Sequence, residues 1–300
     1  MEQHWHGRDR GLIARMGLTI FGLGLLYVVF MAVIIATGAS AVVVVVIAAG
    51  VAFVQLMFSD RLALRSVGAR VVEPQEEPRL HTTIDRLCQL ADVAKPQVAV
   101  SRMDVPNAFA AGRSQKRATI CVTTGLLERL DQEELEGVLA HELTHIINRD
   151  VVVMTVASFL ATVAGLLIRM GLYARSGRGN TAAVLVVVLV ASAVTYALSY
   201  ILLRALSRYR EYAADRGAAS ITGAPSQLAS ALLKVSGEMS RIPDRDLRAA
   251  EPMNAFFILP VSAKGLSISS LFATHPPTEA RVARLMDMQA QIDRRAPRVG

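Results

Sequence analysis

The chain has 300 residues, of which 53% are hydrophobic and 19% are charged, and its formal net charge is +7. An ordinary soluble domain of this length is less apolar, and the composition also excludes disordered, collagen-like and coiled-coil proteins. Cys88 and Cys121 are the only cysteines, too few for a disulfide framework and typical of a reducing compartment. The excess of apolar residues therefore predicts membrane-spanning segments.

Four segments contain no Asp, Glu, Lys, Arg or His: Gly17–Thr37, Ala41–Ser59, Val151–Ile168 and Thr181–Leu203. Each is near the roughly 20 residues that a helix needs to cross about 30 Å of hydrocarbon. A buried core helix is the alternative for the third and shortest segment. A cleaved signal peptide is the alternative for the first, but its length and the apolar segment that follows at once favour a hairpin. We expect up to four transmembrane helices in two hairpins.

The arginines that flank these segments predict an orientation. If both pairs are hairpins, nine arginines share one side of the membrane: Arg8, Arg10, Arg15, Arg61, Arg65, Arg70, Arg204, Arg208 and Arg210. The positive-inside rule places this side in the cytoplasm. Arg169, Arg175 and Arg178, between the third and fourth segments, would face outwards and conflict with it. Because no nucleic-acid-binding motif accompanies the arginines, we expect the lipid bilayer and no nucleic acid as their partner.

Residues 71–150, between the hairpins, have the pattern of a soluble module of mixed structure. A polar linker rich in Pro and Glu precedes apolar residues at helical spacing, which predict an amphipathic helix: Leu80, Ile84, Leu87 and Ala91. Two short strands are expected next, at Val98–Ser101 and Thr119–Thr123, and the Pro-Asn-Ala-Phe-Ala stretch at 106–110 between them is either a strand or a hairpin arm. Asp131 and Glu134 then predict a capped helix that runs directly into the third apolar segment. The fold class expected is α+β, mainly α.

The capped helix carries the sequence His-Glu-Leu-Thr-His at 141–145. Residues four apart lie about 40° apart around a helix, so His141 and His145 point to one side and can share a metal ion. Glu142 is offset by about 100° and can reach a water molecule at that ion. Two histidines at a helix end without a metal would be the plainer interpretation. The spacing, however, is that of a zinc hydrolase.

A third ligand is expected after the fourth apolar segment. Glu211 and Asp215 again lie four residues apart on one helical face. Glu211 can ligate zinc, while Asp215 accepts the outer N–H of His141 or His145. A solvated helix with Glu and Arg pairs would be the favoured interpretation of this segment in isolation. The histidine pair reverses that preference.

Taken together, these motifs resemble the HtpX family of integral-membrane zinc metalloproteases, which are distant relatives of the CAAX prenyl proteases. The similarity covers nearly the whole chain. Its marks are the amino-terminal hairpin, the 106–109 stretch, His-Glu-Leu-Thr-His with Asn148 and Asp150, Ser-Arg-x-x-Glu-Tyr-x-Ala-Asp at 207–215, and Thr-His-Pro-Pro-Thr-Glu-x-Arg at 274–281. The resemblance implies a zincin-like (gluzincin) catalytic domain that holds one Zn²⁺ ion per chain.

The resemblance also implies roles for individual residues. His141, His145 and Glu211 would ligate zinc, and Glu142 would be the general base. Asn107 would lie beside an edge strand that pairs with the substrate backbone, and His275 and Arg281 would contact the substrate carbonyl in the transition state. Asn148, seven residues after His141, would return to the metal-facing side of the helix, whereas Asp150 would lie opposite and end the soluble part of it.

The expected domains are an N-terminal transmembrane hairpin at 1–60, a first catalytic part at 61–150, a second hydrophobic hairpin at 151–203 and a second catalytic part at 204–300. By resemblance, the function is that of a cytoplasm-facing endopeptidase that cleaves misfolded or damaged membrane proteins. A non-catalytic zinc-binding scaffold and a membrane transporter are the alternatives. The first is disfavoured by Glu142, and the second because the four apolar segments contain no ionisable residue. The apolar segment at 251–260 is either a flap, a membrane-dipping patch or part of the packing around the active-site helix.

Overall fold

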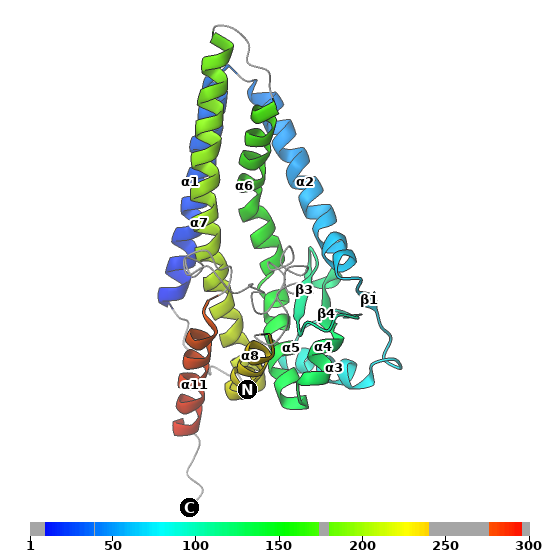
Figure 1. The fold of residues 1–300 in the computed structure, drawn as a ribbon. Coiled ribbons are helices and arrows are strands. Elements are labelled where there is room, and N and C mark those ends of the chain that lie inside the picture. The colour runs from blue at the N-terminus through cyan, green and yellow to red at the C-terminus, as the bar shows by residue number, and fades with distance from the viewer. Residues whose placement is uncertain (1–9, 39, 174–179, 240–275, 296–300) are drawn as a thin grey trace, which may run out of the picture. The chain divides into compact units, whose positions relative to one another are not determined.

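The structure is a computed structural model that describes residues 10–38, 40–173, 180–239 and 276–295. Its chain is mainly helical, with one small mixed sheet (Figure 1), as the sequence predicted. The fold divides into two compact units. Among the described residues, one unit contains 60–152, 210–239 and 276–295, and the other contains 10–38, 40–59, 153–173 and 180–209.

The second unit is built from long apolar helices: α1 (Arg10–Ala36), α2 (Ala41–Ser66), α6 (Asp150–Tyr173) and α7 (Asn180–Thr222), of which α2, α6 and α7 continue into the first unit. Three described segments are long and apolar enough to cross a membrane: Gly11–Ala36, Asp150–Arg169 and Ala182–Thr222. A fourth, in α2, qualifies if its two bent halves count as one span. The prediction of up to four spans is confirmed.

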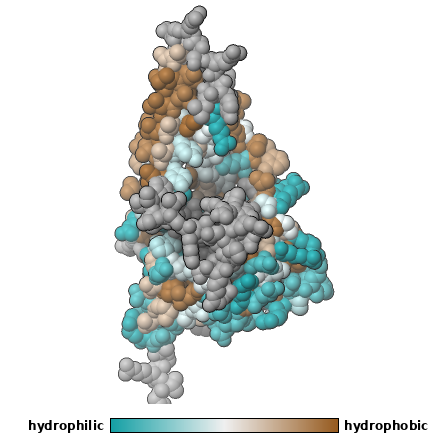
Figure 2. Space-filling view, viewed as in Figure 1, coloured by the Kyte–Doolittle hydropathy of each residue, from teal (hydrophilic) through white to brown (hydrophobic). Residues whose placement is uncertain are grey.

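Packing within this unit has the character of a membrane bundle. Phe30 and Ile34 of α1 form a buried cluster with Leu160 and Ala164 of α6. The outward side chains are also apolar, and Leu18 is 72% exposed. Figure 2 shows this as brown surface over the long helices, in contrast to the mostly teal surface over the sheet-containing unit. Because exposed apolar surface of this extent is unfavourable in water, these helices suit a lipid environment.

The sheet lies in the first unit and has the strand order β1-β2-β4-β3. Its strands are β1 (Arg70–Val71), β2 (Gln97–Ser101), β3 (Ala108–Ala111) and β4 (Thr119–Thr123). The two central strands, β2 and β4, are parallel, while the pairs β1–β2 and β3–β4 are antiparallel. Within the described sheet, β3 pairs with β4 alone and therefore forms an edge.

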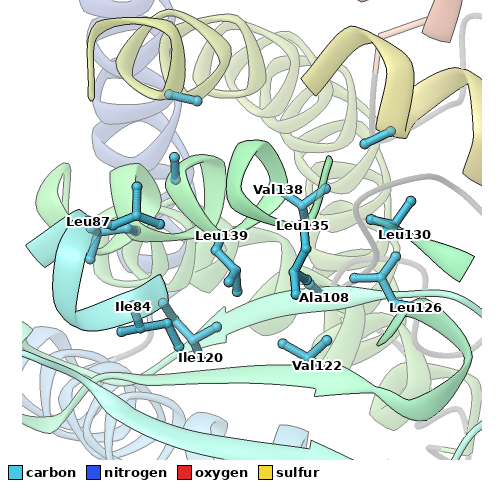
Figure 3. Packing of buried hydrophobic residues seen from close by; sticks show 14 of the residues in the cluster. Ile84, Leu87, Ala108, Ile120, Val122, Leu126, Leu130, Leu135, Val138 and Leu139 are labelled. Carbon is cyan, nitrogen blue, oxygen red and sulfur yellow. The ribbon is translucent and has the colours of Figure 1, made fainter. Parts of the chain in front are cut away.

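Five further helices and one 3₁₀ turn complete the described part of this unit: α3 (Pro78–Ala91), η1 (Gln115–Arg117), α4 (Thr124–Arg129), α5 (Gln132–Ile147), α8 (Pro225–Met239) and α11 (Thr278–Arg295). The centre of the unit is α5, whose residues from Glu134 to Ile146 are all buried. Helices α3 and α8 and strand β3 contact it. Figure 3 shows Leu135, Val138 and Leu139 of α5 packed with apolar residues of α3, α4 and the sheet.

The helix predicted from Asp131 does not continue into the third apolar segment, so that expectation was wrong. Helix α5 ends at Ile147, Asn148 follows it as the C-cap, and α6 begins at Asp150. Between them, Arg149 has a φ of 56°, in the left-handed region that side chains other than glycine rarely adopt. The chain thus changes direction immediately after the His-Glu-Leu-Thr-His segment, which matters for the site.

Candidate metal centre

Helix α5 carries the histidine pair, and a capping box fixes its first turn. The Asp131 carboxylate accepts hydrogen bonds from the backbone N–H groups of Glu133 and Glu134, at 3.0 and 2.9 Å. The Glu134 carboxylate in turn accepts from the N–H of Asp131 at 3.1 Å. Because both hydrogen bonds of the capping box form, Asp131 fixes where α5 begins, as predicted.

The side chains of His141 and His145 meet that of Glu211 at one point inside the protein. The Nε2 atoms of His141 and His145 are 3.1 Å apart. The Glu211 carboxylate approaches both rings, with Oε2 at 3.5 Å from His141 Nε2 and Oε1 at 3.5 Å from His145 Nε2. One ligand atom from each of the three residues lies within 4.8 Å of the others, and all three residues are buried. These three residues could hold a metal ion between them.

Close contact between α7 and α5 brings Glu211 to the histidines. Gly217, six residues after Glu211, lies directly against Thr144 of α5. A Cβ atom on Gly217 would be 2.3 Å from Thr144 Cγ2 and 2.6 Å from its Oγ1, well inside van der Waals contact. The absence of a side chain therefore lets the two helix backbones approach at this level. This glycine had no place in the sequence prediction, because only the packed structure shows what it faces.

The other ring nitrogen of His141, Nδ1, is contacted by Asp215, which is in turn contacted by Arg281. Asp215 Oδ1 lies 3.0 Å from His141 Nδ1. Arg281 of α11 donates to both oxygens of Asp215, from Nη2 at 2.6 Å and from Nε at 2.9 Å. Its Nη1 also lies 3.3 Å from Glu211 Oε2. Arg281 is fully buried, so these acidic groups neutralise its charge.

His145 has a corresponding pair of neighbours. Asp150 Oδ2 lies 2.6 Å from His145 Nδ1, and Asp150 Oδ1 lies 2.9 Å from Nε of Arg210. Asp150 and Arg210 are 3% and 8% exposed. Asp150 was expected to end the soluble helix on the side opposite the metal. It lies against His145 because the chain turns at Arg149. The sequence has no glycine at this position that would have indicated the turn.

The electrostatics of this cluster favour a cation. Burial alone would lower the pKa of His141, but its contacts with Asp215 and Glu211 raise that pKa above its ordinary value. The pKa of His145 rises to about 10, because Asp150 and Glu211 outweigh the effect of burial. Carboxylates that stabilise a proton on these rings stabilise a divalent metal ion at the same place.

Glu142 follows His141 on α5 and is 3% exposed. Burial raises the pKa of Glu142, while nearby His141 and His145 oppose that shift. A small pocket borders His145, between the end of β3 and the α5–α6 turn, and its lining includes Ala111, Gln115 and Ile146. The site therefore combines a ligand set, a buried carboxyl group and an adjoining recess.

The remaining residues of the prediction are distributed differently. Asn107 is buried and lies immediately before edge strand β3, where its N–H donates to Thr123 Oγ1 at 2.8 Å. Asn148 is exposed at the C-cap of α5. Because the helix has ended there, the spacing of seven residues from His141 does not return Asn148 to the metal-facing side. Arg281 contacts acidic groups beside the histidines. His275 and the 251–260 segment lie outside the described residues.

Two histidines four residues apart, a glutamate between them and a third ligand on a later helix define a membrane metallopeptidase of the zincin type. The chain belongs to peptidase family M48, whose model matches residues 74–289. It is 54% identical over 288 residues to "Protease HtpX homolog 1" of Streptomyces coelicolor, covering 95% of each chain. It is 50% identical over 298 residues to "Protease HtpX homolog" of Moorella thermoacetica, covering 96% of this chain and 98% of that one.

The fold is also similar to that of a solved structure. The crystal structure of Ste24p from S. mikatae superposes with a TM-score of 0.54 at 16% sequence identity. The match covers 92% of this chain, which spans 66% of the length of that one. The protein is thus an M48 metalloendopeptidase with several candidate membrane spans, and polypeptides are its class of substrate.

Proposed function

We propose that the protein is a zinc-dependent endopeptidase of the cytoplasmic membrane, with its active site on the cytoplasmic face, that cleaves misfolded or damaged membrane proteins. The observation that carries the catalytic part is the buried meeting point of His141, His145 and Glu211. Two imidazoles and a carboxylate are a frequent ligand set for catalytic zinc, which leaves a further coordination position open. The carboxylates on both Nδ1 atoms support this assignment, because an Nδ1–H that donates to them leaves the Nε2 lone pair for the metal.

Zinc at such a site acts as a Lewis acid that polarises the peptide carbonyl and makes a water molecule more acidic. Glu142 takes the proton from the attacking water as general base. It then returns that proton to the nitrogen of the leaving amine as general acid. Its burial suits the first of these steps, since a raised pKa makes the carboxylate a stronger base towards the water.

Substrate binding is assigned to the edge of the sheet. An extended polypeptide can pair with β3 through backbone hydrogen bonds, which requires little sequence specificity. Asn107 lies immediately before this strand and is the proposed side-chain contact to the substrate backbone. His275 is the proposed donor to the oxyanion. Arg281 is fully buried against Asp215 and Glu211, which favours a positioning role through those two residues over direct contact with the carbonyl.

The zinc dependence can be tested on the full chain in detergent. We expect the protein prepared with zinc to cleave unfolded casein, a metal chelator to stop cleavage, and added Zn²⁺ to restore it. Cleavage that continues after the metal has been removed, as measured by elemental analysis, would contradict the proposal. Casein serves here as a generic unfolded substrate. For the finer substrate class, an unfolded membrane protein should be cleaved faster than its folded form.

The orientation can be tested by a reporter fused at Gly177, between the third and fourth apolar segments. The proposal places this position outside the cytoplasm, because the arginine-rich flanks of the other segments lie inside. A reporter that is active only after export should therefore be active here. Activity of a reporter that works only in the cytoplasm would mean that the second hairpin does not cross the membrane.

A further inference from the structure

Each histidine of the site has an aspartate beside its Nδ1 atom and an arginine beside that aspartate. For His145 these residues are Asp150 and Arg210, and for His141 they are Asp215 and Arg281. We infer that Asp150 and Arg210 are positioning residues that fix the ring of His145 as a metal ligand and thereby set the affinity of the site for its ion. The inference rests on the metal site of the proposed function. It goes beyond that function by assigning a role to two residues that neither the zinc motif nor the ligand set contains.

The contact with His145 has the geometry of a charge-assisted hydrogen bond. Nδ1 of His145 and Oδ2 of Asp150 are 2.6 Å apart, and both residues are buried. An ionised carboxylate accepts only, so Nδ1 must carry the proton. Nε2, which lies beside Glu211 and His141, is then the ring nitrogen left to ligate a metal ion. Asp150 therefore selects both the tautomer and the orientation that metal binding requires.

The break between α5 and α6 makes this contact possible. On a continuous helix, a residue five positions after His145 would lie about 140° away around the axis and could not return to the same ring. The left-handed conformation of Arg149, with its φ of 56°, turns the chain and starts α6 at Asp150. A non-glycine residue in this conformation is strained, because its Cβ comes close to the following carbonyl oxygen. The carboxylate contact it permits supplies a functional reason for such a conformation.

Arg210 is the counter-ion that lets Asp150 remain ionised inside the protein. Its Nε lies 2.9 Å from Asp150 Oδ1, and its side chain is largely buried. An unpaired buried carboxylate would be costly and would tend to take up a proton. Arg210 also immediately precedes the ligand Glu211 on α7. One helix therefore supplies a metal ligand and the guanidinium that supports a second ligand.

A plainer role is a structural ion pair that joins the start of α6 to α7. The two roles differ in their effect on metal binding. A structural pair contributes to the stability of the metal-free protein and leaves the affinity for metal unchanged. A positioning pair changes the affinity, and Arg210 can change it only by way of Asp150.

The test uses the full chain in detergent, with Zn²⁺ affinity measured by competition with a chromophoric chelator. We expect Asp150→Asn to bind Zn²⁺ about 10- to 100-fold more weakly than the parent, the usual range for partners of ligating histidines. The visible spectrum of the Co²⁺-substituted protein should change as well, because it reports the ligand geometry. The matched control is Glu136→Gln, which removes another buried carboxylate of α5, paired with Arg86. This control should keep the affinity and spectrum of the parent.

Arg210→Gln completes a double-mutant cycle. We expect it to weaken Zn²⁺ binding on its own but to have no further effect when Asp150 is already Asn, because Arg210 acts through Asp150. Parent-like affinity in Asp150→Asn, an equal loss in Glu136→Gln, or additive effects in the cycle would overturn the inference. If Asp150→Asn does not fold, parent-like affinity in Arg210→Gln overturns it. A parent protein that binds no Zn²⁺ would instead refute the proposed function.

Discussion

Arg281 donates two hydrogen bonds to Asp215, from Nη2 at 2.6 Å and from Nε at 2.9 Å, although the arginine is fully buried. Asp215 in turn lies 3.0 Å from Nδ1 of His141. The guanidinium on α11 is thus connected through one carboxylate to a metal ligand on α5. Residues 66 positions apart, Asp215 and Arg281, are brought together only when the chain after α7 folds back on the site.

Replacing Arg281 with Met should destabilise the protein strongly. The change leaves Asp215 and Glu211 buried without their counter-ion, and breaking a buried pair on one side typically costs about 3–5 kcal/mol. The measurement is the free energy of unfolding of the metal-free protein in detergent, followed by circular dichroism. Arg294→Met, at an exposed position of the same helix, is the control. Equal stability of the two variants would show that Arg281 does not compensate these acids.

Gly217→Ala should weaken metal binding without touching a ligand. The added Cβ would meet Thr144 at 2.3 Å and push α7, with Glu211, away from the histidines. Competition with a chelator should show a loss of Zn²⁺ affinity, and Thr144→Ala in the same chain should restore part of it by making room. Gly237→Ala, where a Cβ meets no atom within 4 Å, controls for the change in helix propensity. Parent-like affinity in Gly217→Ala would contradict the importance of this contact.

The edge strand gives a prediction about substrate binding. Thr123 N–H donates to Asn107 O at 2.9 Å, and hydrogen-bonded pairs alternate along an antiparallel ladder. The backbone groups of Ala108 and Ala110 therefore face the open side of β3. Ala110→Pro removes one N–H on that side and should lower kcat/KM about 10-fold, the value of one hydrogen bond.

In the same experiment, Ala110→Ser keeps the N–H group and should behave like the parent. Zn²⁺ affinity should be unchanged in both variants, which separates substrate pairing from damage to the metal site. Equal kcat/KM for the Pro and Ser variants would mean that substrates do not pair with β3 at this residue.

Sequence periodicity predicted most of the local structure in this chain. The strand expected at Thr119–Thr123 is β4 with the same bounds, and the capping residues Asp131 and Glu134 do start the helix that carries the zinc motif. These features are local, since a few neighbouring residues decide them. The spacing of Glu211 and Asp215 on one helical face was similarly accessible, because the helix repeat determines it.

Features that break the usual local signals, and the contacts that depend on them, were not accessible. The turn at Arg149 is made by an arginine in a conformation that usually indicates Gly or Asn, so the pattern suggested a continuous helix. Asp150 was consequently assigned to the wrong side of that helix, and Arg210 was counted only as a marker of membrane orientation. The role expected for Asn148 depended on the same continuity, which the structure does not contain.

The central claim is that Glu142 acts as the proton-transferring residue at a zinc site formed by its neighbours. The most direct measurement combines zinc content and casein cleavage for the parent and for Glu142→Gln, prepared in the same detergent. The account predicts one zinc ion per chain in both proteins, and a loss of cleavage in the variant of about 100-fold or more, as expected for a general base. Undiminished cleavage by a zinc-loaded Glu142→Gln protein would contradict it.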